Sequence, residues 1–247
     1  MSEAVEALVV PAGIREDAVR LGFEIEEETW KRLGRYLGLL LATNQTMNLT
    51  AIREPEAAWS RLILDSLTVL PAFESLPEEQ ARVLDVGTGG GLPGMPLAIA
   101  RPDLSFTLVD STQKKIGFLN EVADRLGLTR VKAVAGRAET LGHQSGYRQQ
   151  FDLVVSRAVG PLPVLLEFTL PFVRVGGWCV AMKGPKAEQE LADSGDALAA
   201  LGGGEVQVVE AYPESFENDL VLVLIQKDRA TPKTYPREPG LPKRSPL

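Results

Sequence analysis

The segment RVLDVGTGGGLPGMPLA, residues 82–98, decides how this sequence is interpreted. It begins with an apolar run typical of a buried strand, continues with five glycines within positions 87–94, and ends in an apolar stretch that opens a helix. Glycine loses more backbone entropy on folding than any other residue, so such a cluster indicates a tight turn or a close approach to the backbone. The segment therefore predicts a strand, a glycine turn and a helix, at the sheet edge where open α/β folds bind ligands.

The residues around the glycines indicate which kind of ligand the turn holds. Gly89, Gly91 and Gly94 match the spacing G-x-G-x-x-G of nucleotide-binding turns. Asp110 ends the next apolar run, 19 residues beyond Gly91, near the position expected for a ribose-binding acid. No Gly-Lys-Ser/Thr follows the turn, which excludes a P-loop. A nucleoside-containing cofactor is therefore expected.

Asp85, just before the turn, favours one such cofactor. A carboxylate at this point would repel a diphosphate, which needs backbone N–H groups and a helix N-terminus. S-adenosylmethionine has no phosphate, and its amino-acid end carries an ammonium that Asp85 can hold and a carboxylate that loop N–H groups can hold. The sequence therefore predicts S-adenosylmethionine. A nicotinamide-dependent oxidoreductase that uses the same glycine spacing is the alternative from another class.

The rest of the chain after residue 81 alternates short apolar runs with helical stretches. Strands are predicted at 82–86, 105–109, 131–135, 151–156, 177–182, 205–211 and 220–226. Helices separate most of the first five, which are therefore expected to be parallel, and the last two follow each other closely, as an antiparallel pair does. The expected fold is α/β, with the seven-stranded, Rossmann-like sheet of a class I methyltransferase.

Three regions are predicted along the chain. Residues 1–80 form an N-terminal helical extension, with an amphipathic helix from Glu24 to Asn44 and a second helix that begins near Pro55. Residues 81–228 form the methyltransferase domain, and residues 229–247 form a basic, Pro-rich tail. From residue 227 to the end the net charge is +4, which leaves −11 on the remainder. Such a tail is typical of a solvated, disordered end, with a phosphate-contacting arm as the alternative.

The composition is that of an ordinary globular protein, 45% hydrophobic with a net charge of −7. No apolar run approaches the roughly 20 residues that span a bilayer, and the first twenty residues do not resemble a secretory signal. A cytoplasmic monomer is expected. Cys179 is the one cysteine, which excludes an internal disulfide and a cysteine metal cluster, and its apolar surroundings predict a buried, inert thiol. No metal site is predicted.

The residues near the expected site limit the methyl acceptor. Carbon 5 of a pyrimidine requires a cysteine nucleophile, and the amino group of adenine commonly requires Asn or Asp before Pro-Pro-aromatic, where this chain has SRAV at 156–159. Oxygen acceptors usually need a base, but the one histidine, His143, lies in a polar loop. Guanine N7 carries a lone pair and no proton, so it needs no base. Arg157 is suited to hold the guanine edge, the cofactor carboxylate or a phosphate.

Several segments together resemble one known family. They are QTMNLTAIRE (45–54), RLILDSL (61–67), the glycine segment, LVDSTQKKIGFL (108–119), VVSRAV (154–159), AMKG (181–184) and the ending TPKTYPREPGLPKRSPL (231–247). They are similar to the glucose-inhibited division protein B family, the bacterial small-subunit ribosomal RNA guanine-N7 methyltransferases. The glycine segment alone indicates only a class I methyltransferase, whereas NLTAIR, ILDSL and SRA in this order are much more specific. Many family members have a histidine where this chain has Leu62.

The resemblance implies a set of site residues. The cofactor contacts are expected at Gly87, Leu92, Asp110, Ser111, Thr112, Ala138, Glu139 and Arg157, in addition to Asp85, Gly89 and Gly91. From the residues alone, Glu139 either accepts from the adenine amino group or only starts a helix. Arg157 is the one residue assigned to catalysis, through alignment. The resemblance also implies that Asn48, Asp65, Ser66, Lys183 and Gly184 lie around the acceptor entrance.

The implied substrate is 16S ribosomal RNA or the small ribosomal subunit, methylated at a guanine in a loop near the decoding region. RNA contacts are expected at Asn48, Arg53, Arg61, Lys183, Lys233 and Arg237, and a one-sided basic surface is expected around the cofactor mouth. Two alternatives remain besides the oxidoreductase: a methyltransferase that acts on a small molecule or a protein, and a non-catalytic RNA-binding assembly factor.

Overall fold

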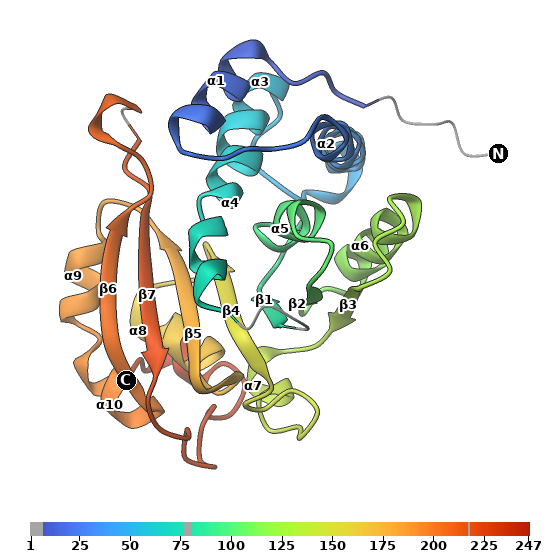
Figure 1. Cartoon of the computed structure of the whole chain (residues 1–247). Helices are drawn as coiled ribbons and strands as arrows, with labels where there is room; N and C mark the ends of the chain where they lie inside the picture. The colour runs from blue at the N-terminus through green and yellow to red at the C-terminus, as the bar shows by residue number, and fades with distance from the viewer. Residues whose placement is uncertain (1–6, 77–80, 217) are drawn as a thin grey trace.

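The architecture is a seven-stranded sheet between two layers of helices (Figure 1). A computed structural model describes residues 7–76, 81–216 and 218–247. The strand order is β3-β2-β1-β4-β5-β7-β6. The strands are β1 (Arg82–Val86), β2 (Ser105–Asp110), β3 (Val131–Ala135), β4 (Phe151–Arg157), β5 (Val173–Lys183), β6 (Gly203–Glu210) and β7 (Val221–Lys227). β1 to β5 are parallel, and β7 runs antiparallel between β5 and β6. The predicted fold is confirmed.

The central strands, such as β1 and β4, are buried on both sides because their side chains alternate between two cores. On β1, Leu84 and Val86 belong to one core and Val83 to another, and on β4 the neighbours Val154 and Val155 divide in the same way. One face is covered by α5 (Gly94–Ala100), α6 (Gln113–Arg125) and the turn η2 (Leu70–Ser75). The other face is covered by α7 (Ala138–Leu141), α8 (Leu162–Thr169), α9 (Ala187–Ala192) and α10 (Gly195–Leu201).

The predicted helices before residue 81 lie over α5 and α6, as Figure 1 shows at its top. They are α1 (Ala12–Arg20), α2 (Glu27–Met47) and a continuous run of α3 (Pro55–Ala58), the π-helical turn η1 (Trp59–Leu64) and α4 (Asp65–Leu67). The apolar stripe of α2 is buried, with Trp30, Leu33, Leu37 and Leu40 at most 3% exposed. The core of these helices is continuous with that of α5 and α6. The division of the chain at residue 81 remains a prediction.

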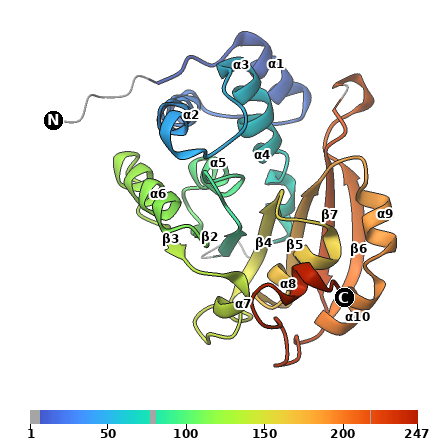
Figure 2. The ribbon, with the colours of Figure 1, turned by 180° about the vertical axis from the view of Figure 1, so that it is seen from behind.

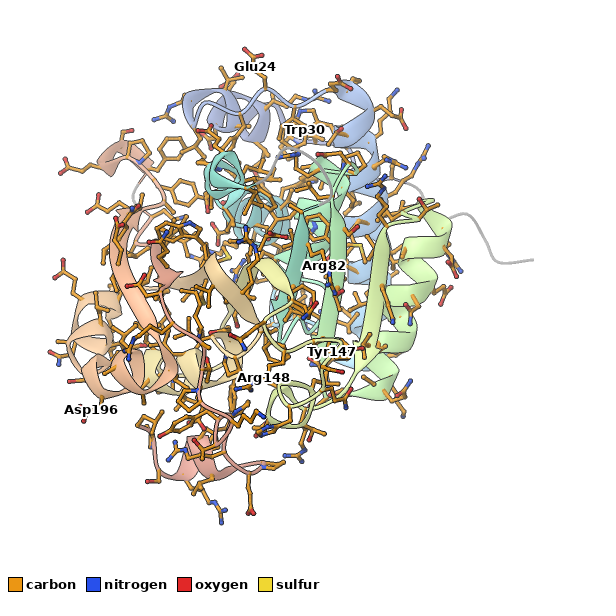
Figure 3. All side chains as sticks on the ribbon, turned by 60° about the horizontal axis from the view of Figure 1, so that its bottom comes forward. Glu24, Trp30, Arg82, Tyr147, Arg148 and Asp196 are labelled. Atoms are coloured by element: carbon orange, nitrogen blue, oxygen red, sulfur yellow. The ribbon has the colours of Figure 1, made fainter. Side chains whose placement is uncertain are left out.

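The basic tail packs against the sheet domain, so the expectation of a solvated end is not met. Arg148 donates hydrogen bonds to the carbonyl oxygens of Thr231 (2.6 Å), Pro232 (3.0 Å) and Tyr235 (2.8 Å). Figure 3 labels Arg148, which lies beside this segment. Figure 2 shows the end of the chain, with α11 (Leu241–Arg244), crossing α8. Within the described residues, no helix is long and apolar enough to span a membrane.

Candidate active site

The glycine turn after β1 has the conformation that its composition predicts. Gly87, Gly89 and Gly91 have positive φ angles of 75°, 57° and 106°, which side-chain-bearing residues rarely adopt. The N–H groups of Gly87 and Thr88 donate to Val109 O at 2.8 and 3.0 Å, so the turn is fixed to β2. A Cβ on Gly87 would lie 2.5 Å from Val159 Cγ2. Glycine at this position therefore lets the loop after β4 approach the end of β1.

Asp85 is fully buried beneath the turn. Its Oδ2 accepts hydrogen bonds from Thr88 Oγ1 (2.6 Å) and from Gly94 N (2.9 Å) at the start of α5. Its Oδ1 has no hydrogen-bond partner in the described structure. Burial raises the pKa of Asp85 to about 7, and the nearby charge of Asp110 acts in the same direction. The second oxygen is thus an acceptor that a bound cation can satisfy.

Asp110, at the end of β2, supports the turn from the other side. Its Oδ2 accepts from Gly89 N at 3.1 Å, and its Oδ1 accepts from Thr112 N at 2.8 Å. Ser156, at the end of β4, is fully buried and donates from Oγ to Val86 O at 2.8 Å. These bonds join the carboxyl ends of β1, β2 and β4.

An inner pocket of about 360 Å³ opens at these strand ends. Its volume lies within the usual range for small-molecule sites. Of the predicted cofactor residues it is lined by Gly87, Asp110, Ser111, Ala138 and Glu139. Asp85, Gly89, Gly91, Leu92, Thr112 and Arg157 do not line it. Glu139 is buried, and its Oε1 accepts from Gly240 N at 2.9 Å, a tail contact that the sequence did not indicate.

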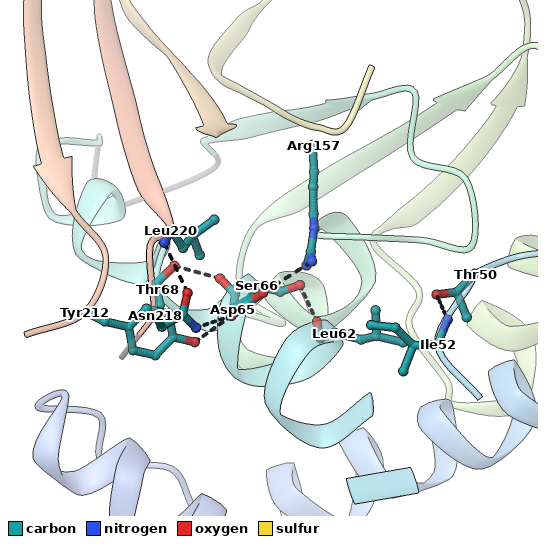
Figure 4. A network of polar contacts seen from close by, with 10 residues as sticks. All are labelled: Thr50, Ile52, Leu62, Asp65, Ser66, Thr68, Arg157, Tyr212, Asn218 and Leu220. Atoms are coloured by element: carbon teal, nitrogen blue, oxygen red, sulfur yellow. Dashed lines mark hydrogen bonds and ion pairs between the residues drawn. The ribbon is translucent and has the colours of Figure 1, made fainter. Parts of the chain in front are cut away.

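Arg157 and Asp65 form the centre of a second group of polar side chains (Figure 4). Arg157 Nη2 lies 3.2 Å from Asp65 Oδ2, while Asp65 Oδ1 accepts from Tyr212 Oη (2.7 Å) and from Asn218 Nδ2 (3.4 Å). Desolvation raises the pKa of Asp65, and its bonds to Tyr212 and Arg157 oppose that rise. Arg157 Nη1 is buried and has no partner in the described structure. The guanidinium is therefore held through Nη2 and keeps one unpaired donor at Nη1.

An outer pocket of about 740 Å³ lies beside this group. Arg157 and Asp65 line it together with Arg61, Lys183 and Gly184. Lys183 is paired with Glu190 at 2.6 Å and donates to Gly160 O at 2.8 Å. Ala158 lines both pockets and has a φ of 56°, unusual for a residue with a side chain. The two pockets therefore meet at this residue.

The remaining predicted residues are placed as follows. Ser66 is fully buried and donates to Leu62 O at 2.6 Å, so it does not line the outer pocket. Asn48 is exposed in a left-handed conformation at the end of α2, next to Leu49, which packs against the glycine turn. Arg53 lines a separate depression beside α2. The structure thus brings Arg61 and Lys183 to the outer pocket, but not Arg53.

The two tail residues assigned to RNA lie away from the outer pocket lining. Lys233 is exposed. Arg237 forms an ion pair with Glu167, its Nη2 lying 2.7 Å from Oε2. The outer pocket itself carries both signs of charge: Arg61, Arg157, Lys183 and Lys186 against Asp65, Glu190 and Asp219. The lining of the outer pocket is therefore mixed in charge, and the one-sided basic surface around the cofactor mouth stays a prediction.

The comparison of the sequence with known families gives a match over most of this structure. The model described as rRNA small subunit methyltransferase G matches residues 29–218. The chain belongs to this family. A relative with the name ribosomal RNA small subunit methyltransferase G, from Moorella thermoacetica, is 44% identical over 92% of this chain and 93% of its own length. One of that name from Sorangium cellulosum is 44% identical over 93% and 92%.

Solved structures agree with this family at the level of the fold. The S-adenosylmethionine-dependent methyltransferase SibL has a TM-score of 0.54 at 19% identity, covering 86% of this chain and 76% of its own. A methyltransferase of the same cofactor class from Methanococcus maripaludis has a TM-score of 0.53 at 13% identity, covering 80% and 94%. Both share the architecture expected for the rRNA small subunit methyltransferase G family.

The structure adds residues to the site of this family member that the sequence did not indicate. Tyr36 of α2 lies in the apolar helix stripe, yet its hydroxyl reaches the glycine turn. Tyr212 and Asn218 hold Asp65 from the loop between β6 and β7, and Gly240 and Lys243 line the inner pocket from the tail. For the tail residues, the one signal in the sequence was that residues 231–247 resemble the ending of the family. That resemblance did not imply that any tail residue lies in the cofactor site.

Two other predictions concern residues outside the pockets. Cys179 is fully buried and donates from Sγ to Thr169 Oγ1 at 3.3 Å, as expected for an inert thiol. Burial raises its pKa to about 11. His143 donates from Nε2 to Pro236 O at 2.7 Å and therefore contacts the tail. Within the described part of the chain, no three His, Cys, Asp or Glu side chains form a group that could hold a metal ion.

Proposed function

We propose that this chain transfers the methyl group of S-adenosylmethionine to N7 of a guanine in a loop of 16S ribosomal RNA. The observation that carries the proposal is that Asp85 Oδ1 and Arg157 Nη1 are both buried without a hydrogen-bond partner in the described structure, and that their residues lie near the carboxyl ends of the adjacent parallel strands β1 and β4. A buried polar atom without a partner costs free energy, so both atoms are suited to a ligand that supplies the missing partners.

The amino-acid end of S-adenosylmethionine supplies such partners. Its ammonium matches Asp85, and its carboxylate matches the N–H groups of the glycine turn or the guanidinium of Arg157. The nucleoside matches the inner pocket, with Asp110 for the ribose and Ala138 and Glu139 for the adenine. A diphosphate fits this arrangement poorly, since the Asp85 carboxylate lies directly beneath the turn. When bound, the cofactor supplies the electrophilic methyl group.

The outer pocket is the proposed place of the guanine, because it adjoins the inner pocket at Ala158. Two of its three carboxylates, Asp65 and Glu190, are engaged by Arg157 and Lys183 and so are poorly placed to remove a proton from an acceptor, and the third, Asp219, is exposed to solvent. N7 of guanine has no proton to remove. Positioning alone can then accelerate the in-line transfer, for which well-oriented reactions gain about 7–11 kcal/mol. Arg61 and Lys183 are proposed to contact the RNA backbone.

The test uses small-subunit RNA from cells that lack the enzyme, the purified chain and labelled S-adenosylmethionine. We expect label at a single guanine, followed by chain cleavage at that base under chemistry specific for N7-methylguanine. A synthetic loop with 7-deazaguanine at that position should accept no methyl group. Labelling of the deaza substrate would refute the N7 assignment, and labelling of a protein or a small molecule in place of RNA would favour the first alternative.

A further inference from the structure

The tail reaches the inner pocket at two points. Gly240 and Lys243 belong to its lining, although they follow the last strand of the sheet by more than ten residues. Gly240 N donates to Glu139 Oε1 at 2.9 Å, and Gly240 has a φ of 86°, which a glycine adopts freely. The ammonium of Lys243 lies 5.9 Å from the centre of the Phe168 ring, another residue of the lining. The tail thus forms part of the pocket.

The tail is held in this place by strong contacts. Glu167 of α8 is fully buried, and its carboxylate accepts from the backbone N–H and the guanidinium of Arg237 at 2.7–3.1 Å. Lys227, also fully buried, donates to Thr231 Oγ1 and to Leu201 O. Breaking the first set would leave the buried Glu167 carboxylate without a partner, and breaking the second would leave a buried donor unsatisfied, so the tail has a defined position before any ligand arrives.

Lys243 itself is not engaged in this anchoring. Its side chain is exposed, and among the described residues it forms no hydrogen bond or ion pair. Its ammonium lies over the Phe168 ring of α8, and Gly240, three residues earlier, contacts Glu139, the residue assigned to the adenine, whereas Arg157 and Asp85 do not line this pocket. A free ammonium at this end matches the ring nitrogens and hydroxyl groups of a nucleoside, which are hydrogen-bond acceptors.

We propose that the tail forms a wall of the cofactor pocket through Gly240 and Lys243 and that Lys243 contacts the nucleoside half of S-adenosylmethionine. The inference rests on the proposed function, because it takes the inner pocket as the cofactor site. It adds a binding residue, Lys243, and assigns the basic tail to the cofactor. Binding and tail docking then stabilise each other, since a ligand that touches the docked tail favours that state.

The test is calorimetric, so it does not depend on methyl transfer. S-adenosylhomocysteine and 5′-methylthioadenosine, which lacks the amino-acid end, are titrated into the wild-type chain, Lys243→Ala and Arg244→Ala. Arg244 is the matched control, since it is an exposed tail cation next to Lys243 that does not line the pocket. Lys243→Ala should weaken both ligands by the same factor, about tenfold for one charge-assisted hydrogen bond. Arg244→Ala should stay within about twofold.

The other outcomes separate the two proposals. If the wild-type chain binds neither ligand, the proposed function fails. If it binds both and Lys243→Ala binds as tightly as Arg244→Ala, the Lys243 contact is refuted and the function stands. A loss for S-adenosylhomocysteine alone would place Lys243 at the amino-acid half and overturn the nucleoside assignment. Amide hydrogen exchange in residues 237–244 should slow when S-adenosylhomocysteine binds, and unchanged exchange would refute the wall.

Discussion

Tyr36 Oη donates a 3.0 Å hydrogen bond to the carbonyl oxygen of Gly90, so a residue of helix α2 holds the glycine turn from outside. Leu40, one helical turn further along α2, would lie 2.8 Å from a Cβ on Gly90, so the helix and the turn are in close contact. The helices before residue 81 therefore shape the proposed cofactor site although they contribute nothing to its lining.

Replacement of Tyr36 by Phe should lower both the stability of the protein and its affinity for S-adenosylhomocysteine. The change keeps the ring and leaves the buried Gly90 carbonyl without its partner, which costs about 1–3 kcal/mol. We expect the free energy of unfolding in urea to fall by that amount and S-adenosylhomocysteine to bind more weakly. Tyr147→Phe is the control, because its hydroxyl forms no hydrogen bond within the described structure. Equal effects of the two variants would contradict the prediction.

The stability of the chain without ligand should depend on pH through Asp85. Its pKa is about 7 in the folded protein and 3.8 as the reference value, so the folded state binds an extra proton between these limits. Stability therefore falls as pH rises through this interval. Asp85→Asn lacks this loss, and the difference in unfolding free energy between Asp85→Asn and wild type should grow from pH 4 to pH 8. If the unfolding free energies of the two proteins change in parallel with pH, Asp85 is not the cause of the pH dependence.

Cofactor affinity should show the opposite trend with pH. An ammonium beside Asp85 favours the carboxylate, so binding below pH 7 releases a proton and becomes weaker as pH falls. Calorimetry with S-adenosylhomocysteine in buffers of different ionisation enthalpy measures this proton release directly. No release at pH 6 would mean that Asp85 does not hold the amino-acid end.

The Asp65 carboxylate should be required for both stability and methyl transfer. Asp65→Asn removes the charge that faces Arg157 and leaves a partly buried guanidinium unpaired, at a cost of about 3 kcal/mol. Arg157 would lose its fixed orientation, so kcat should fall while the affinity for S-adenosylhomocysteine changes less. Asp103→Asn breaks an exposed ion pair with Arg101 and should cost less than about 1 kcal/mol. A normal kcat for Asp65→Asn would disprove the positioning role.

Arg237→Ala separates a structural role of this residue from an RNA-binding one. It leaves the fully buried Glu167 carboxylate without its ion pair, so the free energy of unfolding should fall by about 3 kcal/mol or more. Lys31→Ala, which breaks an exposed pair with Glu28, should cost below about 0.5 kcal/mol. Lys233→Ala should weaken RNA binding without any loss of stability. If Arg237→Ala weakens only RNA binding, the structural role is wrong.

The sheet and the glycine turn were predictable because their signals are local. The predicted strands end within one residue of the ends of β1 to β4, and Asp85 and Asp110 follow from their places beside the glycines. The contact of Tyr36 with Gly90 joins residues 54 positions apart, and no periodicity along α2 distinguishes its hydroxyl from an ordinary core ring. The approach of Tyr212 to Asp65 is equally invisible in the sequence, since it spans 147 positions.

The prediction of a solvated, disordered tail was based on its composition, and the structure does not bear it out. Proline and positive charge predict a solvated segment, but they do not indicate which acidic side chain pairs with Arg237. Glu167 lies in the apolar helix α8, 70 positions before Arg237. Only the folded arrangement brings the two together and then places Lys243 at the pocket.

Ala158 borders both pockets through a single methyl group, on a backbone with a φ of 56°. Any bulkier residue there would suffer twice: from torsional strain in the left-handed region, which is worst for β-branched side chains, and from obstruction of the gap between donor and acceptor. Glycine alone would relieve the strain, but it would widen the boundary between the inner and the outer pocket. Natural variation at this point should accordingly be confined to the two smallest amino acids.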